Sequence, residues 1–310
     1  MKKYCFISVA FASILCFSCN RDNEILENFP EDNPLESDSP FTKESFTVID
    51  FLPAPGQFIN DPSCGYDNIY THEEAIAYAQ ERLSKNSFVS LGSWGGYIVV
   101  KSPESIYASD GNEFAIGCNS FDSSNEPGIV WVMKDSNKNG LPDDTWYELK
   151  GAYFEENGFQ KNYWVTYFRP QPYSSTTWID SDGEEGEIAW LGNYHSQEYY
   201  YPEWVEEDSY TLYGSRLPAL AEQNPNTGMW KILPFKWGYA DNSGEDSKML
   251  TINGNTIMVN FFSIANAVDD NNQPVFLESI DFIKVQTAVN SVSGWLGEFS
   301  TEVTGFFISK

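Results

Sequence analysis

The sequence predicts an all-β domain, built as a sandwich or a barrel. Short runs rich in β-branched and aromatic residues recur from Phe46 onward, as strands do in such folds. Clusters of Gly, Asn, Asp and Pro separate these runs, whereas βαβ units would place helical patterns between them. In the run 209–213, polar and apolar residues alternate, which is typical of a strand with one face in water.

The expected strands follow one another along the whole body of the chain. In order they are 46–52, 88–91, 97–101, 113–118, 128–134, 145–149, 163–168, 209–213, 230–234, 256–262, 280–286 and 304–308. No linker-like stretch and no internal repeat interrupts residues 46–310. We therefore expect a single domain, large but within the range of a decorated sandwich.

One helix is predicted, over residues 71–85. Thr71 is a good N-cap, and Glu74 completes a capping box with it. An apolar stripe then follows at helical spacing: Ala75, Ile76, Ala79 and Leu83.

The chain is strongly acidic, with 18 Lys and Arg against 45 Asp and Glu and a formal net charge of −27. Such a surface repels phosphate backbones, so we expect no nucleic-acid partner. It repels anionic lipid headgroups as well, so any membrane attachment has to come from something other than basic residues. Aromatic residues make up 16% of the chain, which favours a packed core over a disordered acidic chain.

The first 18 residues have the layout of a secretory signal peptide. Lys2 and Lys3 precede an apolar run, 4–17, that is short for a bilayer span. Ser18 then precedes Cys19, which resembles a bacterial lipobox with Cys19 as the lipidated residue. Ordinary signal-peptidase cleavage and an uncleaved short anchor are the alternatives. An acyl chain buries many methylenes at once, and so supplies the membrane affinity that the charge forbids.

Residues 19–46 are predicted to form a lipidated, acidic and disordered linker, since they are rich in Asp, Glu and Pro and cannot bury a core. An acidic stretch directly after the cysteine also resembles the signal that sends Bacteroidota lipoproteins to the outer face of the outer membrane. The expected organisation is therefore a signal peptide (1–18), a linker (19–46) and one domain (47–310), displayed at the cell surface.

Two cysteines, Cys64 and Cys118, remain outside the leader. In an oxidising compartment they could pair, or each could be a small buried hydrophobe. Their spacing shows no zinc pattern, and the sequence leaves the disulfide open.

The segment 135–144 resembles the first part of an EF-hand calcium loop, with oxygen-bearing side chains at alternate positions and Gly140 at the turn. The predicted ligands of a structural calcium ion are Asp135, Asn137, Asn139, the main-chain carbonyl of Leu141, and Asp143. An EF-hand loop has a glutamate at its twelfth position, which binds the ion through both oxygens. Here Trp146 occupies that position, and the nearest glutamate, Glu148, lies two residues further on. The alternative is a polar hairpin loop in which Asp and Asn form turns. A second acidic, Gly-broken segment, 180–187, is expected to be a solvated loop, with a bound cation as its alternative.

An aromatic run at 194–204 is the candidate ligand site, since exposed Tyr and Trp faces suit sugar rings or a planar ligand. The residues expected to contribute are His195, Gln197, Tyr199, Tyr201 and Trp204. In an extended segment Tyr199 and Tyr201 would share a face while Tyr200 points the other way. Packing within the core is the competing interpretation of the same residues.

Catalytic motifs are missing from the sequence: it contains no G-x-S-x-G, no H-E-x-x-H, no Walker loop and no dinucleotide fingerprint. The 45 acidic residues leave paired carboxylates for glycoside hydrolysis as an open alternative.

Six segments together resemble a poorly characterised family of Bacteroidota cell-surface lipoproteins of jelly-roll type. They are 48–58 with PAPGQF, 90–96, 125–132, 140–149 within NGLPDDTWYEL, 237–241 and 280–287. The resemblance runs from about 47 to 305 and implies one jelly-roll-like β-sandwich. Some similar proteins accompany outer-membrane uptake systems for corrinoids or glycans, which implies ligand capture rather than turnover. The resemblance supplies no catalytic residues.

We therefore expect a non-enzymatic outer-membrane lipoprotein that binds a small ligand, a glycan or a corrinoid, for a partner transporter. Two other classes stay open: a glycan-cleaving enzyme and a structural or adhesive surface protein.

Overall fold

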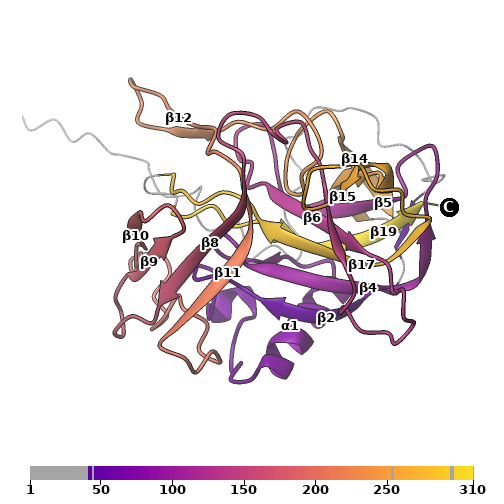
Figure 1. Cartoon of the computed structure of the whole chain (residues 1–310). Helices are drawn as coiled ribbons and strands as arrows, with labels where there is room; N and C mark the ends of the chain where they lie inside the picture. Colours follow the sequence, from indigo (N-terminus) through magenta and orange to yellow (C-terminus); the bar gives the residue numbers. More distant parts are fainter. Residues whose placement is uncertain (1–40, 44, 253–254, 294–296, 310) are drawn as a thin grey trace, which may run out of the picture.

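Antiparallel β-sheets make up most of the structure, a computed structural model that describes residues 41–43, 45–252, 255–293 and 297–309. The expected all-β sandwich with one short α-helix is confirmed (Figure 1). The predicted signal peptide, Cys19 and most of the predicted linker lie outside the described residues. Within the described ranges, no helix is long and apolar enough to cross a membrane.

The elements are, in chain order, β1 (Phe41–Lys43), β2 (Thr47–Leu52), η1 (Pro62–Cys64), α1 (His72–Ser84), β3 (Val89–Ser90), β4 (Tyr97–Tyr107), β5 (Phe114–Cys118), β6 (Gly128–Met133), β7 (Trp146–Leu149), β8 (Gln160–Phe168), β9 (Thr176–Asp180), β10 (Glu185–Ile188), β11 (Ser209–Arg216), β12 (Ala221–Gln223), β13 (Trp230–Ile232), β14 (Ser247–Ile252), β15 (Asn255–Phe262), η2 (Ile264–Asn266), β16 (Ala267–Val268), β17 (Ser279–Thr287), β18 (Glu302–Val303) and β19 (Gly305–Ser309).

Two large sheets form the sandwich. One has the strand order β16-β7-β6-β17-β4-β2 and the other β1-β19-β5-β15-β14. Alternate residues of each strand face the partner sheet, so Ile98 and Val100 of β4 share one buried cluster with Ile116 of β5 and Phe306 of β19. The opposite face of the six-stranded sheet points away from this core.

A smaller sheet, with the order β10-β9-β8-β11, lies beside the six-stranded sheet (Figure 1). It has a core of its own, in which Tyr163 and Val165 of β8 pack with Trp94 and Leu212. Tyr97 of β4 packs against the same cluster. The small sheet therefore stands against the outer face of the six-stranded sheet, and this arrangement positions the candidate site.

The predicted helix and its start are confirmed. Thr71 Oγ1 accepts a hydrogen bond from the Glu74 backbone N–H at 3.2 Å, and Glu74 Oε2 accepts one from the Thr71 backbone N–H at 3.0 Å. Ala75, Ala79 and Leu83 are buried in the main core. A local capping signal and a periodic apolar stripe were sufficient to place this element.

Every predicted strand overlaps an observed one, but the sequence missed β1, β9, β10, β12, β14, β16 and β18. Strand β1 falls within the stretch assigned to the linker. Its residue Phe41 pairs with Ser309 and is buried, so the domain includes 41–43 as well. Backbone pairing with β19 outweighs the acidic composition of the neighbouring sequence there.

The acidic segment 180–187 is a β-hairpin rather than a loop, because β9 and β10 pair across it. Asp180 is buried and accepts hydrogen bonds from the Tyr163 hydroxyl and from the backbone N–H groups of Asp182 and Glu184. Its oxygens are thus satisfied by protein groups.

Cys118 is a free, buried thiol, so the disulfide between Cys64 and Cys118 that the sequence left open does not form. The Cys118 Sγ donates to Asn260 Oδ1 at 3.4 Å, and burial raises the pKa of the thiol to about 12.

Candidate functional site

A groove of about 520 Å³ opens between the outer face of the six-stranded sheet and the strands β8 and β11. Three tryptophans line it: Trp131, Trp146 and Trp164. Pockets of this volume, lined by aromatic side chains and a few polar groups, are typical of small-molecule sites.

The floor of the groove lies on a single row of residues that crosses five strands. Of this row, Asp50, Val99, Lys284 and Trp131 line the groove, and Glu148 does not. Asp50 of β2 lies opposite Val99 of β4, and Val99 opposite Lys284 of β17. Lys284 in turn lies opposite Trp131 of β6, and Trp131 opposite Glu148 of β7. Since residues directly opposite one another project from the same face of a sheet, the register alone gathers these five side chains.

Lys284 stands at the centre of this row. Its Nζ lies 4.6 Å from the centroid of the Tyr97 ring and 5.8 Å from that of Trp131, within the range of cation–π attraction. Burial lowers the pKa of Lys284 to about 8, and the Asp50 carboxylate opposes that shift. The groove thus offers a partly desolvated ammonium between two aromatic faces.

The indole N–H of Trp131 is buried and has no hydrogen-bond partner within the described chain. A buried donor without a partner is costly, and Trp131 lines the groove. A ligand oxygen in the groove would satisfy it.

The opposite wall comes from β8 and β11, where Trp164 lies opposite Tyr213. In the part of the chain that the structure describes, Trp164 packs against none of the buried clusters. Tyr213 is 66% exposed. These two rings are therefore free to contact a ligand, and little of the fold depends on them.

Glu148 ends the floor row. The Ser215 hydroxyl donates to its Oε2 at 2.6 Å, and burial raises the pKa of Glu148 to about 7. Asp50 lies four strand spacings away along the same row, which is roughly 19 Å at about 4.8 Å for each spacing. Glycosidase carboxylates lie about 5–9.5 Å apart, so Asp50 and Glu148 do not form such a pair.

The aromatic run at 194–204 lies outside this groove, and none of its five predicted ligand residues lines it. Tyr201 is buried, with Arg169 4.6 Å from its ring centroid, so the expectation that it stacks on a ligand is wrong. Tyr200 is buried too. The predicted alternation of faces fails because this segment forms turns rather than a strand.

Trp204 is partly buried and bridges two of the hydrophobic clusters. Its indole N–H donates to the Tyr66 hydroxyl at 3.0 Å, and its ring stacks on His72 with the centroids 5.0 Å apart. The backbone carbonyl of Tyr199 accepts from Asn60 Nδ2 at 3.0 Å. Packing thus explains most of the aromatic run.

Two of the predicted ligand residues, His195 and Gln197, fasten the run to residues 57–61. His195 Nδ1 lies 2.8 Å from Asp61 Oδ2. Gln197 Nε2 donates to the carbonyls of Gln57 at 2.7 Å and Ile59 at 2.8 Å. The His195 ring and the Gln197 amide nitrogen are thereby engaged with the protein, whereas the buried Gln197 Oε1 has no hydrogen-bond partner within the described chain.

The predicted calcium loop connects β6 to β7 and brings its candidate ligands together. Asp135 accepts from the backbone N–H groups of Asn139 at 3.1 Å and Gly140 at 2.8 Å. Asp143 accepts from Asn137 Nδ2 at 3.2 Å and from Asn139 Nδ2 at 2.9 Å. Gly140 has a φ of 77°, a conformation that glycine adopts without strain.

The neighbours of this loop link it to the groove. The Leu141 side chain is 54% exposed, and its backbone N–H donates to Asn139 Oδ1 at 2.7 Å. Pro142 lines the groove, and so does Trp146, which occupies the twelfth position of the loop in place of the glutamate of an EF-hand. Glu148 contacts Ser215 instead, so the late glutamate does not complete the loop.

Comparisons with protein-family models and with curated proteins found no match to this chain. The geometry of the groove therefore carries the functional argument.

Proposed function

We propose that the chain is a non-enzymatic lipoprotein of the outer-membrane surface that captures a glycan in this groove for a partner transporter. The lipobox-like sequence at Cys19 and the acidic stretch after it support display at the surface. The groove supports capture, because aromatic faces and a few polar groups line it.

The observation that carries the proposal is the combination of aromatic faces with the unpartnered Trp131 indole N–H and the Lys284 ammonium in one groove. Sugar rings present flat C–H faces, which stack on Trp164 and Tyr213, and hydroxyl oxygens, which accept from Trp131 and Lys284. A corrinoid is much bulkier than a sugar ring, and only part of it would enter about 520 Å³. The chemistry therefore favours a glycan.

A structural calcium ion in the loop 135–144 is part of the same proposal. The convergence of Asp135, Asn137, Asn139 and Asp143 supports it, since a hard cation takes six to eight oxygens. Because Pro142 belongs to this loop and lines the groove, an ion here would hold one wall of the binding site.

Replacing Asp143 by asparagine is expected to remove the part of the calcium-dependent stabilisation that comes from the loop. An ion that binds only the folded state raises its stability, and the change removes one ligand charge. The measurement is the melting temperature in calcium and in chelator.

Asp144→Asn is the matched control, because Asp144 is the adjacent carboxylate and its Oδ2 accepts only the Ser136 backbone N–H among the hydrogen bonds of the described chain. If calcium raises the melting temperature of both variants and of the unaltered protein equally, the loop 135–144 does not bind the stabilising ion.

The function itself is tested by screening the purified chain against soluble glycans and corrinoids, with product analysis of every mixture. Glycan binding without new reducing ends supports capture. New reducing ends would show the enzyme, corrinoid binding alone would show the other ligand class, and binding to neither would favour the adhesive protein.

A further inference from the structure

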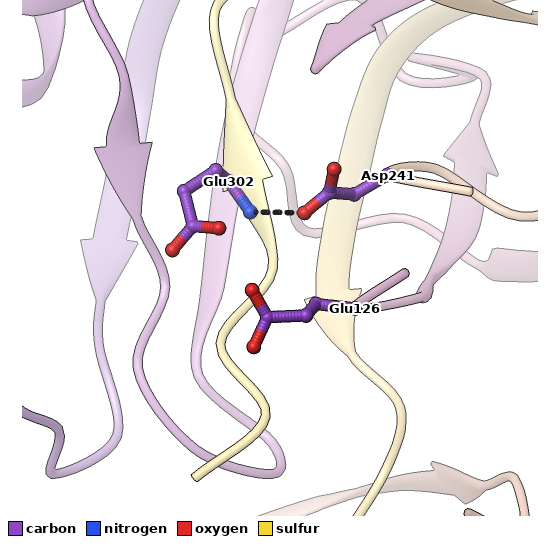
Figure 2. A group of neighbouring side chains, drawn as sticks. All are labelled: Glu126, Asp241 and Glu302. Atoms are coloured by element: carbon purple, nitrogen blue, oxygen red, sulfur yellow. Dashed lines mark hydrogen bonds between the residues drawn. The ribbon is translucent and has the colours of Figure 1, made fainter. Parts of the chain in front are cut away.

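Three acidic side chains meet in the fold, and none of them belongs to the calcium-like loop 135–144. Glu126 directly precedes β6, Asp241 follows β13, and Glu302 begins β18. One carboxylate oxygen from each lies within 4.8 Å of the other two. Figure 2 shows the three carboxylates turned toward a shared space.

Backbone groups hold two of these carboxylates in place. The Glu302 backbone N–H donates to Asp241 Oδ2 at 2.9 Å (Figure 2). The Asn119 backbone N–H donates to Asp241 Oδ1 at 3.4 Å. The Ser300 backbone N–H donates to Glu126 Oε1 at 3.0 Å. None of the ion pairs between described residues includes any of the three.

Glu302 gives the second, independent sign of a missing partner. Its side chain is only 2% exposed, and its Oε1 has no hydrogen-bond partner within the described chain. A buried carboxylate oxygen left unpaired is costly, whereas a cation in the shared space would satisfy it.

We propose that Glu126, Asp241 and Glu302 bind a calcium ion that ties together the start of β6, the segment after β13, and β18. Calcium–oxygen distances of about 2.3–2.6 Å place two ligands of one ion at most about 5 Å apart, which matches this cluster. Magnesium, at about 2.0–2.1 Å, would need all ligand atoms within about 4.2 Å. Glu126 is only partly buried.

Among the described residues, the groups that act most strongly on the carboxylates of the cluster are acidic or neutral. Glu298 adds negative charge beside Glu126, and the Cys118 thiol contacts Asp241. Burial raises the pKa of Glu126 to about 8 and of Asp241 to about 7, and it also raises that of Glu302. Protons and calcium therefore compete for the same oxygens.

The test counts calcium ions per chain after the protein has been stripped with chelator, reloaded with Ca²⁺ alone at pH 8 and desalted. Glu302→Gln keeps the side-chain shape and is expected to retain one ion fewer than the unaltered protein. Asp143→Asn is expected to keep the buried ion, whatever happens at its own loop. An unchanged count in both Glu302→Gln and Glu126→Gln would overturn the proposal, provided each variant melts cooperatively.

Melting curves at pH 8 give a second readout. An ion that binds only the folded chain raises its stability, so we expect Ca²⁺ to raise the melting temperature of the chelator-stripped protein. We expect a smaller rise in Glu302→Gln. A calcium response at pH 8 that survives in Glu302→Gln at full size would contradict the site.

Discussion

Replacing Trp164 by alanine is expected to lower the affinity of the protein for its glycan by about 5-fold to 150-fold, with little change in melting temperature. Stacking on one aromatic face contributes about 1–3 kcal/mol, by analogy with base stacking, and each 1.4 kcal/mol is about tenfold. The stability should hold because Trp164 lines the groove and packs against none of the buried clusters of the described chain. Calorimetric titration gives the affinity.

Trp230→Ala is the matched control. Trp230 is also a partly exposed tryptophan in a strand, it packs against none of those clusters, and it does not line the groove. Its removal should leave the affinity unchanged. Equal losses in the two variants, or a loss only in Trp230→Ala, would move the binding site out of the groove.

Replacing Trp204 by alanine is expected to have the opposite signature: a loss of about 3–5 kcal/mol in the free energy of unfolding, with normal glycan binding. The ring bridges two hydrophobic clusters. Its removal also leaves the buried Tyr66 hydroxyl without the indole donor, and such a lost hydrogen bond adds to the cost of the cavity.

Denaturant unfolding measures this loss for Trp204→Ala, and the same sample is used for the titration. If Trp204→Ala unfolds like the unaltered protein but binds glycan weakly, the aromatic run 194–204 is a ligand site. That result would contradict the conclusion that its residues serve in packing.

The elements that the sequence predicted are those with strong local signals. The helix α1 was placed because a capping box and an apolar stripe both lie within 15 neighbouring residues, 71–85. The strand β14 was missed although Asn253-Gly254, a dipeptide typical of tight hairpin turns, directly follows Ser247–Ile252 in the sequence. That signal should have placed a strand on both sides of it, as the pairing of β14 with β15 does.

The groove could not be predicted, because its floor is assembled by cross-strand register. Asp50, Trp131 and Lys284 lie far apart in sequence and meet only in the sheet order β7-β6-β17-β4-β2. A faint signal existed: Tyr97, Val99 and Lys101 alternate with apolar residues of the core face. No single sequence indicates which strands will be neighbours.

The aromatic run was misleading for a related reason. Density of Tyr and Trp along the chain indicates either a binding surface or a packed junction, and these differ only in what covers the rings. Here the PAPGQF segment and the small sheet cover Tyr200 and Tyr201. The calcium loop was clearer, since its candidate ligands are local and the structure brings them together.

Capture of a glycan in the groove is tested most directly by following the indole N–H resonances of the tryptophans by NMR during a glycan titration. Tryptophan-to-phenylalanine variants assign each resonance. We expect the signals of Trp131, Trp146 and Trp164 to shift together, while those of Trp204 and Trp230 stay in place. Shifts confined to Trp204, with the three groove signals unmoved at saturation, would contradict the assignment.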